Sequence, residues 1–297
     1  MIRTAFVILT LVLTTPTRSG AEQLANQLFA AKDQPSQQVS EPIGSYARGC
    51  GAGMVALPES GPTWQAMRLS RNRHYGQPDL VNYLVDLSVA ATRVGWAGLY
   101  IGDMSQPRGG PMDSGHASHQ IGLDVDIWYT PPPRLDLSFK EREKLGAMIV
   151  RTDDQRSVNG NWTRSHAALL QAAASDPRVD RIFVAAAIKI EMCKTAKAKD
   201  KKWLQKIRPI YGHHDHFHVR LKCPKGADAC KTQTPTVAEL SKDGNGCDET
   251  LEWWVTDYLN PPKATGPAKP APPREKTPRE FTMADLPKQC AGVLASR

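Results

Sequence analysis

Six cysteines restrict how this chain can fold more than any other feature of its sequence. None forms a CxxC pair or lies near enough to a second cysteine for a thiolate zinc knuckle: Cys50, Cys193, Cys223, Cys230, Cys247 and Cys290. In an exported protein an even set of this kind indicates disulfides throughout. Spacing alone leaves the connectivity open and shows only that Cys223 and Cys230 would close the easiest local loop.

The amino terminus has the order of a secretory signal peptide. Residues 1–21 carry an early arginine, an apolar run over 5–13 and small residues at 19–21. This order predicts export and cleavage near Ala21. The apolar run is far shorter than the roughly 20 residues that cross a bilayer, and no later segment is long and apolar enough. We therefore expect an exported protein that does not span the membrane.

The net charge of the chain does not identify a binding partner. Of 38 Lys and Arg, Arg3 and Arg18 leave with the signal, so 36 remain against 30 Asp and Glu, a net charge of +6. Such a mild excess favours anionic partners only weakly. A nucleic-acid groove would need a compact basic run with interleaved aromatic residues, and the sequence has none, so we expect no nucleic-acid partner.

Hydrophobic periodicity predicts helices and strands in irregular alternation. Helical spacing covers 77–94, 138–150 and 162–174, and strand patterns cover 96–104, 122–129, 181–187 and 216–223. This order predicts an α+β fold with a mainly antiparallel central sheet and flanking helices. No internal repeat is present.

The two ends of the mature chain look different from its middle. Residues 22–45 are polar and Gln-rich, which indicates a lead-in rather than core. Residues 260–280 are rich in Pro and Lys and are typical of a semi-rigid tail. Because Cys290 lies beyond this tail, we expect the end of the chain to be linked back to the body. The predicted organisation is a signal peptide over 1–21, one domain over 22–259 and a tail over 260–297.

Six of the eight histidines fall in two short windows. SGHASHQIGLDVDIW (114–128) contains two of them, and YGHHDHFHV (211–219) contains four: His116, His119, His213, His214, His216 and His218. Isolated His74 and His166 are more typical of a surface or a helix face. Such clustering points instead to metal binding or proton transfer.

The two windows have the parts of a hydrolytic zinc site. Such a site needs three His or carboxylate ligands, an open fourth position and a nearby base. His119 can lie in a loop that enters a strand, with Asp126 on the strand itself. His216 and His218 are two apart, so in a strand they face the same side about 7 Å from each other. One of them can bind the metal while the other reaches the water that the metal activates.

Other hydrolase signatures are missing from the sequence. The full chain contains no HExxH, GxSxG or SxxK motif. A structural zinc site and a histidine cluster without metal are the alternatives, although closed structural sites more often use cysteines.

The motifs carry a resemblance to a known family. HASHQIGLDVD and the later HFH resemble the metallopeptidase superfamily of lysostaphin-type enzymes, D-Ala-D-Ala peptidases and the hedgehog amino-terminal domain. The longer stretches SGHASHQIGLDVDIW, IGDM, RIFVAAAIK and HFHVRLKCP more closely resemble the penicillin-insensitive murein endopeptidases of the Gram-negative periplasm. The resemblance extends over nearly the whole mature chain, including the cysteines and the Pro-rich tail. It implies a single disulfide-stapled domain of this superfamily type.

The resemblance also implies an activity and a ligand set. The activity is a periplasmic, zinc-dependent and penicillin-insensitive cleavage of the D-alanyl to meso-diaminopimelyl cross-link of peptidoglycan. The implied Zn²⁺ ligands are His119, Asp126 and His218. His216 would act in catalysis by handling the proton of the activated water, and His213 would polarise the substrate.

Three further residue assignments follow, two of them from the resemblance. His116 would lie near the metal and could serve a second ion. Some relatives have a further Asp and His metal pair, but the matching positions here are Asp153 and Arg156, which puts a second site in doubt. Asp124 shares the strand face with Asp126, so we assign it to orienting a ligand or an arginine.

The disulfides implied by the resemblance are Cys50 to Cys290, Cys193 to Cys247 and Cys223 to Cys230. Two other functions stay open. A D-Ala-D-Ala carboxypeptidase or dipeptidase would need a cation for the free carboxylate, for which Arg108 and Arg220 are candidates. A zinc-containing wall-binding protein without catalysis is the other alternative.

Overall fold

The computed structural model describes residues 22–263 and 273–297, so the predicted signal peptide lies outside the described residues. A central sheet of seven strands organises the described chain. Its strands lie in the order β10 (Ile207–Pro209), β9 (Val179–Val184), β11 (His216–Leu221), β8 (Asp124–Trp128), β7 (Leu99–Ile101), β5 (Trp64–Ala66) and β4 (Ser60–Gly61). Only the β10–β9 and β5–β7 pairs are parallel. The predicted α+β class with a mainly antiparallel sheet is therefore confirmed.

Two small two-stranded sheets and a set of mostly short helices complete the fold. The sheets pair β1 (Glu41–Ser45) with β2 (Arg48–Ala52) and β3 (Val55–Ala56) with β6 (Tyr75–Gly76). The α-helices are α1 (Ala25–Ala30), α2 (Pro78–Arg93), α3 (Phe139–Lys144), α4 (Arg164–Ser175), α5 (Ala186–Cys193), α6 (Lys201–Leu204), α7 (Val237–Leu240), α8 (Thr250–Val255) and α9 (Gln289–Ala295). Short 3₁₀ turns are η1 (Leu69–Arg71), η2 (Ala198–Asp200), η3 (Pro278–Glu280) and η4 (Met283–Asp285).

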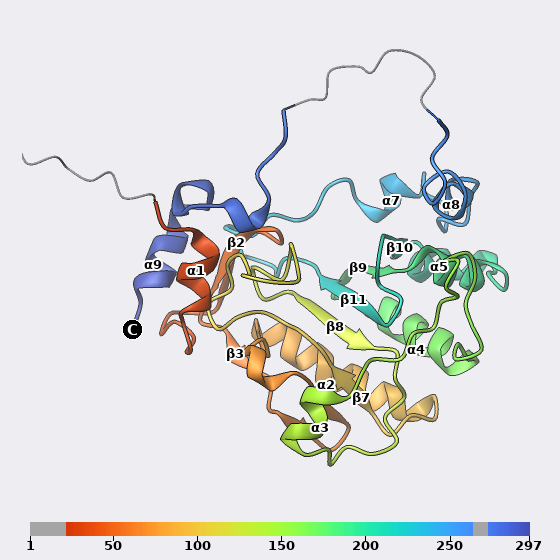
Figure 1. Cartoon of the computed structure of the whole chain (residues 1–297), viewed down its shortest axis with the longest axis horizontal. Helices are drawn as coiled ribbons and strands as arrows, with labels where there is room; N and C mark the ends of the chain where they lie inside the picture. The colour runs from red at the N-terminus through yellow and green to blue at the C-terminus, as the bar shows by residue number, and fades with distance from the viewer. Residues whose placement is uncertain (1–21, 264–272) are drawn as a thin grey trace, which may run out of the picture.

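The main core lies on one face of the sheet. Helix α2 begins with Pro78 and Asp79, a favourable first turn, and buries a stripe that includes Leu80, Leu84 and Leu87. This stripe and the buried face of α4 belong to the same cluster as the inward residues of β8 and β11. Figure 1 shows α2 and α4 behind these two strands. The opposite face of β8 and β11 is therefore free to carry polar side chains.

Two predicted boundaries were wrong. The helix expected over 138–150 begins at Phe139, where the Ser138 side chain caps it, but ends at Lys144. Beyond it the backbone is held by other segments: Met148 N donates to Thr130 Oγ1 (2.8 Å) and Val150 N donates to His214 O (2.9 Å). The strand expected over 181–187 ends at Val184, where the Ala-rich continuation begins α5.

The interpretation of 22–45 as a lead-in was also wrong. Ala25 and Phe29 of α1 are fully buried in a small second core with Cys50, Phe281 and Cys290. Ala25 N donates to Phe281 O at 2.7 Å. These partners come from the far end of the chain, so local periodicity could not reveal them. Figure 1 shows α1 beside α9 at the left edge of the molecule.

The structure contains disulfides Cys50–Cys290, Cys193–Cys247 and Cys223–Cys230, the pairs that the family resemblance implied. The first closes a sequence separation of 240 residues and joins β2 to α9.

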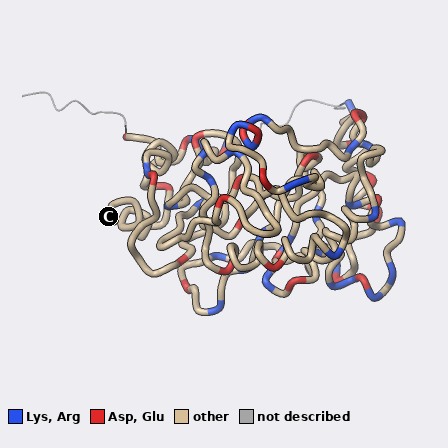
Figure 2. Tube along the Cα trace, turned by 90° about the horizontal axis from the view of Figure 1, so that it is seen from below, with Lys and Arg blue, Asp and Glu red and all other residues tan. Residues whose placement is uncertain are grey.

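Within residues 22–263 and 273–297, no helix is both long and apolar enough to cross a membrane. Figure 2 shows acidic and basic residues interspersed along the trace.

Candidate metal centre

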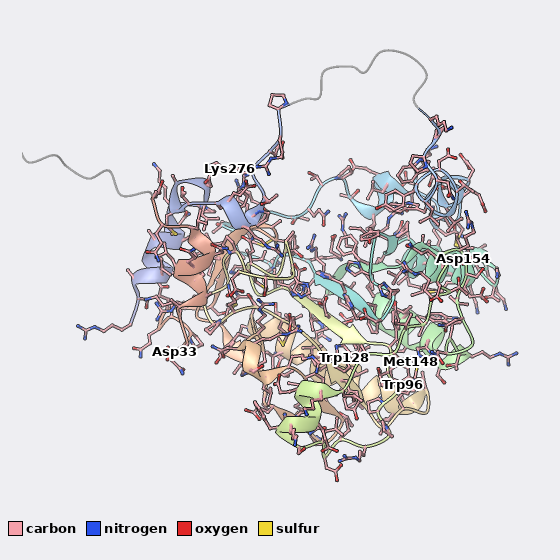
Figure 3. All side chains as sticks on the ribbon, viewed as in Figure 1. Asp33, Trp96, Trp128, Met148, Asp154 and Lys276 are labelled. Carbon is pink, nitrogen blue, oxygen red and sulfur yellow. A yellow bond between two sulfur atoms is a disulfide. The ribbon has the colours of Figure 1, made fainter. Side chains whose placement is uncertain are left out.

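The pairing of β8 with β11 brings the two histidine windows together. In this antiparallel pair His218 lies opposite Asp126, and Arg220 lies opposite Asp124. Because side chains alternate along a strand, these four share one face, while Val125 and its neighbours enter the core on the other. Figure 3 shows Trp128 at the end of β8, opposite His216 in the register. The site is thus built on two neighbouring strands in the interior of the sheet.

Asp126 is the centre of the histidine cluster. Its Oδ1 lies 3.2 Å from His218 Nδ1 and 3.5 Å from His119 Nε2. Its Oδ2 lies 3.4 Å from His116 Nδ1. His216 Nε2 is slightly more distant, at 3.7 Å from Oδ1. The structure therefore groups all four of these predicted histidines around one carboxylate.

Several of these atoms are buried without a hydrogen-bond partner among the described residues. They are Asp126 Oδ1, both ring nitrogens of His119 and Nε2 of His218, which lies 3.2 Å from Asp124 Oδ1 but without hydrogen-bond geometry. Buried polar atoms are normally satisfied, because burying them without a partner costs free energy. Ligand atoms of His116, His119 and Asp126 lie within 4.8 Å of one another. Nitrogen and carboxylate ligand atoms that converge in this way fit a zinc ion.

Local backbone geometry turns His119 toward Asp126. His119 adopts a positive φ of 66°, an uncommon conformation for a residue with a side chain. Its backbone N donates to Asp124 Oδ2 at 3.0 Å. Asp124 also accepts hydrogen bonds from Arg220 Nε (2.8 Å) and Nη2 (3.0 Å). Asp124 therefore contacts both a predicted ligand and an arginine, the two kinds of partner expected for it.

His216 lies between two carboxylates. Its Nδ1 is 2.7 Å from Asp215 Oδ1, and its Nε2 faces Asp126. Burial lowers the pKa of His216, but Asp126 and Asp215 outweigh burial and raise it to about 9. For Asp126, burial raises the pKa, yet His216, His116 and His119 hold it well below its usual range. The two side chains favour each other's charged forms.

His213 borders the same cluster with the opposite electrostatics. Its ring centre lies 4.9 Å from that of His216, and its Nδ1 is 2.9 Å from Tyr211 O. Burial and the neighbouring His216 and His218 lower its pKa to about 4. His214 contributes its backbone carbonyl oxygen, which accepts a hydrogen bond from Val150 N.

The sequence interpretation missed two carboxylates of the site. Asp103 Oδ2 lies 3.0 Å from His116 Nε2 and also binds Arg71 and Arg73. Asp215 orients His216, as described above. Asp103 follows β7, which neighbours β8, and Asp215 lies inside the second histidine window. Both residues are close in sequence to predicted strands of the site, and this closeness is the signal that could have identified them.

A cavity of about 210 Å³ opens beside the cluster. Its walls include His116, Asp126, His216 and Trp128 together with Arg68 and Arg71. Arg68 is held by main-chain carbonyls, with Nη1 to Arg142 O at 3.0 Å and Nη2 to Leu145 O at 2.8 Å. The pocket thus combines the histidine cluster with two guanidinium groups.

The two arginines proposed to clamp a carboxylate are engaged elsewhere. Arg108 is buried and donates to the carbonyls of Val293 and Leu294 near the carboxyl terminus. Arg220 is bound to Asp124. His166 lies on α4, one of the two placements expected for it, but on the buried face: it is 1% exposed and its Nε2 lies 2.8 Å from Tyr129 O.

Comparison with known proteins places the chain in a family. The sequence model described as "Penicillin-insensitive murein endopeptidase" matches residues 42–295. A penicillin-insensitive murein endopeptidase of Haemophilus influenzae is 43% identical over 232 residues, covering 78% of each chain. One of Klebsiella pneumoniae is 37% identical over 278 residues, covering 93% of this chain and 94% of the relative. One of Yersinia enterocolitica is 38% identical over 267 residues, covering 88% and 90%.

The match spans β1 through α9 and so contains the whole histidine cluster as well as the strands that build it. With these identities over most of each chain, the protein belongs to the penicillin-insensitive murein endopeptidase family.

Proposed function

We propose that the chain is a zinc-dependent endopeptidase that hydrolyses the D-alanyl to meso-diaminopimelyl cross-link of peptidoglycan in the periplasm. Membership of a murein endopeptidase family supports the substrate class. The observation that carries the metal assignment is the group of orphaned atoms on Asp126, His119 and His218. In this proposal His119, Asp126 and His218 hold the zinc, with His116 beside them.

Bound zinc would supply a Lewis acid for the scissile carbonyl and would lower the pKa of a water toward about 7. The chain's own residues do the rest. His216 holds or moves a proton at Nε2, because Asp215 fixes its Nδ1. His213 already donates from Nδ1 to Tyr211 O, so it can polarise the oxygen on which charge develops only when its ring also carries a proton on Nε2.

This chemistry needs no nucleophilic serine. The sequence has neither GxSxG nor SxxK, and no acyl-enzyme is formed in the proposed reaction. Since β-lactams act by acylating a serine, the proposal accounts for insensitivity to penicillin.

A terminal D-Ala-D-Ala peptidase is the second candidate. Such an enzyme must clamp the free carboxylate of its substrate with a cation. The engagement of Arg108 and Arg220 disfavours this activity, and Arg68 in the pocket wall is likewise bound to main-chain carbonyls. Arg71 in the same wall supports it, because its side chain is 48% exposed although it also contacts Asp103.

Purified cross-linked muropeptide dimers, incubated with the protein and zinc, separate these candidates. Dimers that become monomers support the endopeptidase, and release of a single D-Ala supports the terminal peptidase. EDTA should abolish the hydrolysis and added Zn²⁺ should restore it. Full activity in metal-free protein would overturn the zinc assignment, and no change in the dimers would favour a wall-binding protein.

We also propose export by a signal peptide over 1–21, followed by a peptidase domain over 22–259 and a tail over 260–297 that Cys290 tethers. Amino-terminal sequencing of the secreted protein checks cleavage near Ala21. A mature protein that still begins at Met1 would contradict this organisation.

A further inference from the structure

Exposed aromatic side chains gather at one place on the described surface. Tyr211, Trp253 and Tyr258 are 67%, 47% and 38% exposed, and Trp254 lies against the last two. The ring centres of Trp253 and Trp254 are each about 5 Å from that of Tyr258, at 5.2 and 5.1 Å. Tyr211 is 6.3 Å from Tyr258. We call these four residues the aromatic platform.

The platform is held in place by the fold. Helix α8 buries Leu251 and Val255 and packs against α5, which leaves the Trp253 side exposed. Disulfide Cys193–Cys247 ties the residue at the end of α5 to the segment that leads into α8. Tyr258 N donates to Trp253 O at 2.9 Å, which folds the chain back after the helix. Figure 1 shows α8 close to α5 and β10.

The backbone of Tyr211 connects the platform to the edge of the histidine cluster. Tyr211 O is hydrogen-bonded to His213 Nδ1, and His213 borders His216. The loop that carries both residues is fixed at each side, by Ile210 N to Val184 O (3.0 Å) and Ala185 N to His213 O (2.9 Å). Because Tyr211 is two residues before His213, a polymer bound at the cluster can extend to these rings.

We propose that the aromatic platform binds the glycan strand of the substrate, by stacking of amino-sugar rings on its aromatic faces. This inference rests on the proposed function, because only a murein substrate brings sugars to this site. The faces of a pyranose ring carry C–H groups and are apolar, whereas its hydroxyl and amide groups point outward. Flat exposed rings with hydroxyl and indole N–H groups at their edges suit both parts of such a ligand. A solvent-exposed cluster of this kind typically marks a binding surface.

The test uses the full mature protein and peptide-free glycan strands as the binding probe. The variants are Trp253→Ala and Tyr258→Ala, alone and together, with Phe139→Ala as the matched control, since Phe139 is a 56% exposed aromatic on α3. Each lost ring should weaken glycan binding about two- to tenfold. Trp253→Phe should keep most of the binding, which separates the loss of a ring from a folding defect.

Activity assays on two substrates complete the test. The double variant should cleave intact sacculi roughly tenfold more slowly but should cleave a sugar-free cross-linked peptide at the parent rate. Equal binding of glycan by the double variant and the Phe139→Ala control overturns the inference while leaving the endopeptidase proposal intact. Equal losses on both substrates, or a wild-type dimer in sedimentation that Trp253→Ala dissociates, also overturn it. If the parent cleaves neither substrate, the proposed function fails instead.

Discussion

Two buried aspartates lie two residues apart on the same face of β8, and their surroundings differ. Asp124 accepts two hydrogen bonds from Arg220 and one from the backbone of His119. Asp126 has histidines on several sides, yet its Oδ1 has no hydrogen-bond partner among the described residues. At Asp124 the β8–β11 pair carries a complete ion pair with Arg220, and we call this the closed end. At Asp126 it carries a group of candidate metal-ligand atoms, and we call this the open end.

The difference shows how one strand pair serves both stability and function. Leaving a buried carboxylate oxygen unpaired costs free energy, so an arrangement of this kind persists where a ligand completes it. The closed end also orients the open one, because Asp124 holds the backbone of His119 while Arg220 holds Asp124. We therefore interpret Asp124 and Arg220 as the support for the open end.

The largest expected effects come from the two histidines of β11 at the open end. His218→Ala removes a proposed ligand, so metal content and activity should be lost together. His216→Ala removes the proton carrier, so zinc should stay bound while the rate falls by roughly 10²- to 10⁴-fold. Zinc content by mass spectrometry beside dimer cleavage measures both.

His74→Ala serves as the control, because His74 stacks on Tyr75, outside the cluster around Asp126. Loss of metal in His216→Ala with retention in His218→Ala would reverse the two roles. If both variants stayed active, the catalytic site would lie elsewhere.

Removal of the long disulfide should weaken the open end through its supporting loop. Gln120 Oε1 accepts from Gly49 N at 3.1 Å, which fixes the histidine-bearing loop on β2 beside Cys50. Cys290→Ser opens a link across 240 residues, which in the chain-entropy model lowers the free energy of unfolding by about 5 kcal/mol. Chemical unfolding measures this, with Cys223→Ser, which opens a separation of 7, as the milder comparison. A Cys290→Ser variant as stable as the parent would show that the staple does not support the fold.

Lys189 offers a third buried charge to compare with the aspartates. Its Nζ donates to Leu204 O (2.7 Å) and Asn245 O (2.8 Å), and burial, with Arg208 adding to it, lowers its pKa to about 7. In the unfolded chain its pKa is near 10.5, so between these values the unfolded state binds more protons and stability rises with pH.

Relative to Lys189→Met, the parent should therefore gain up to about 1.4 kcal/mol of unfolding free energy per pH unit above pH 7. Urea unfolding of both proteins at pH 7, 8 and 9 measures the gain. Parallel curves would mean that Lys189 keeps its proton in the fold.

The sequence predicted the strands of the site better than their pairing. The alternation in DVDIW and HFHVRL predicts that Asp124 and Asp126 share a face and that His216 and His218 do too. It does not predict the register that sets Arg220 opposite Asp124, because register depends on contacts between segments far apart in sequence.

The same limit explains the other errors. Phe29 is buried by residues near 281 and 290, and the segment after Lys144 is held by loops from Thr130 and His214. In both cases residues far away in the sequence determine the structure, and their contacts override the local secondary-structure propensity.

The contrast between the two aspartates is tested most directly by exchanging each for asparagine and measuring zinc content and unfolding free energy on the same samples. Asp124→Asn should lower the stability of the metal-free protein by about 3–5 kcal/mol, because it leaves the Arg220 charge buried without its partner. Asp126→Asn should lose zinc but should destabilise the metal-free protein less than Asp124→Asn does, because Asp126 Oδ1 makes no hydrogen bond and the histidines around it, unlike Arg220, can give up their protons. If Asp126→Asn kept its zinc, or destabilised the metal-free protein more than Asp124→Asn, the division into a closed and an open end would be contradicted.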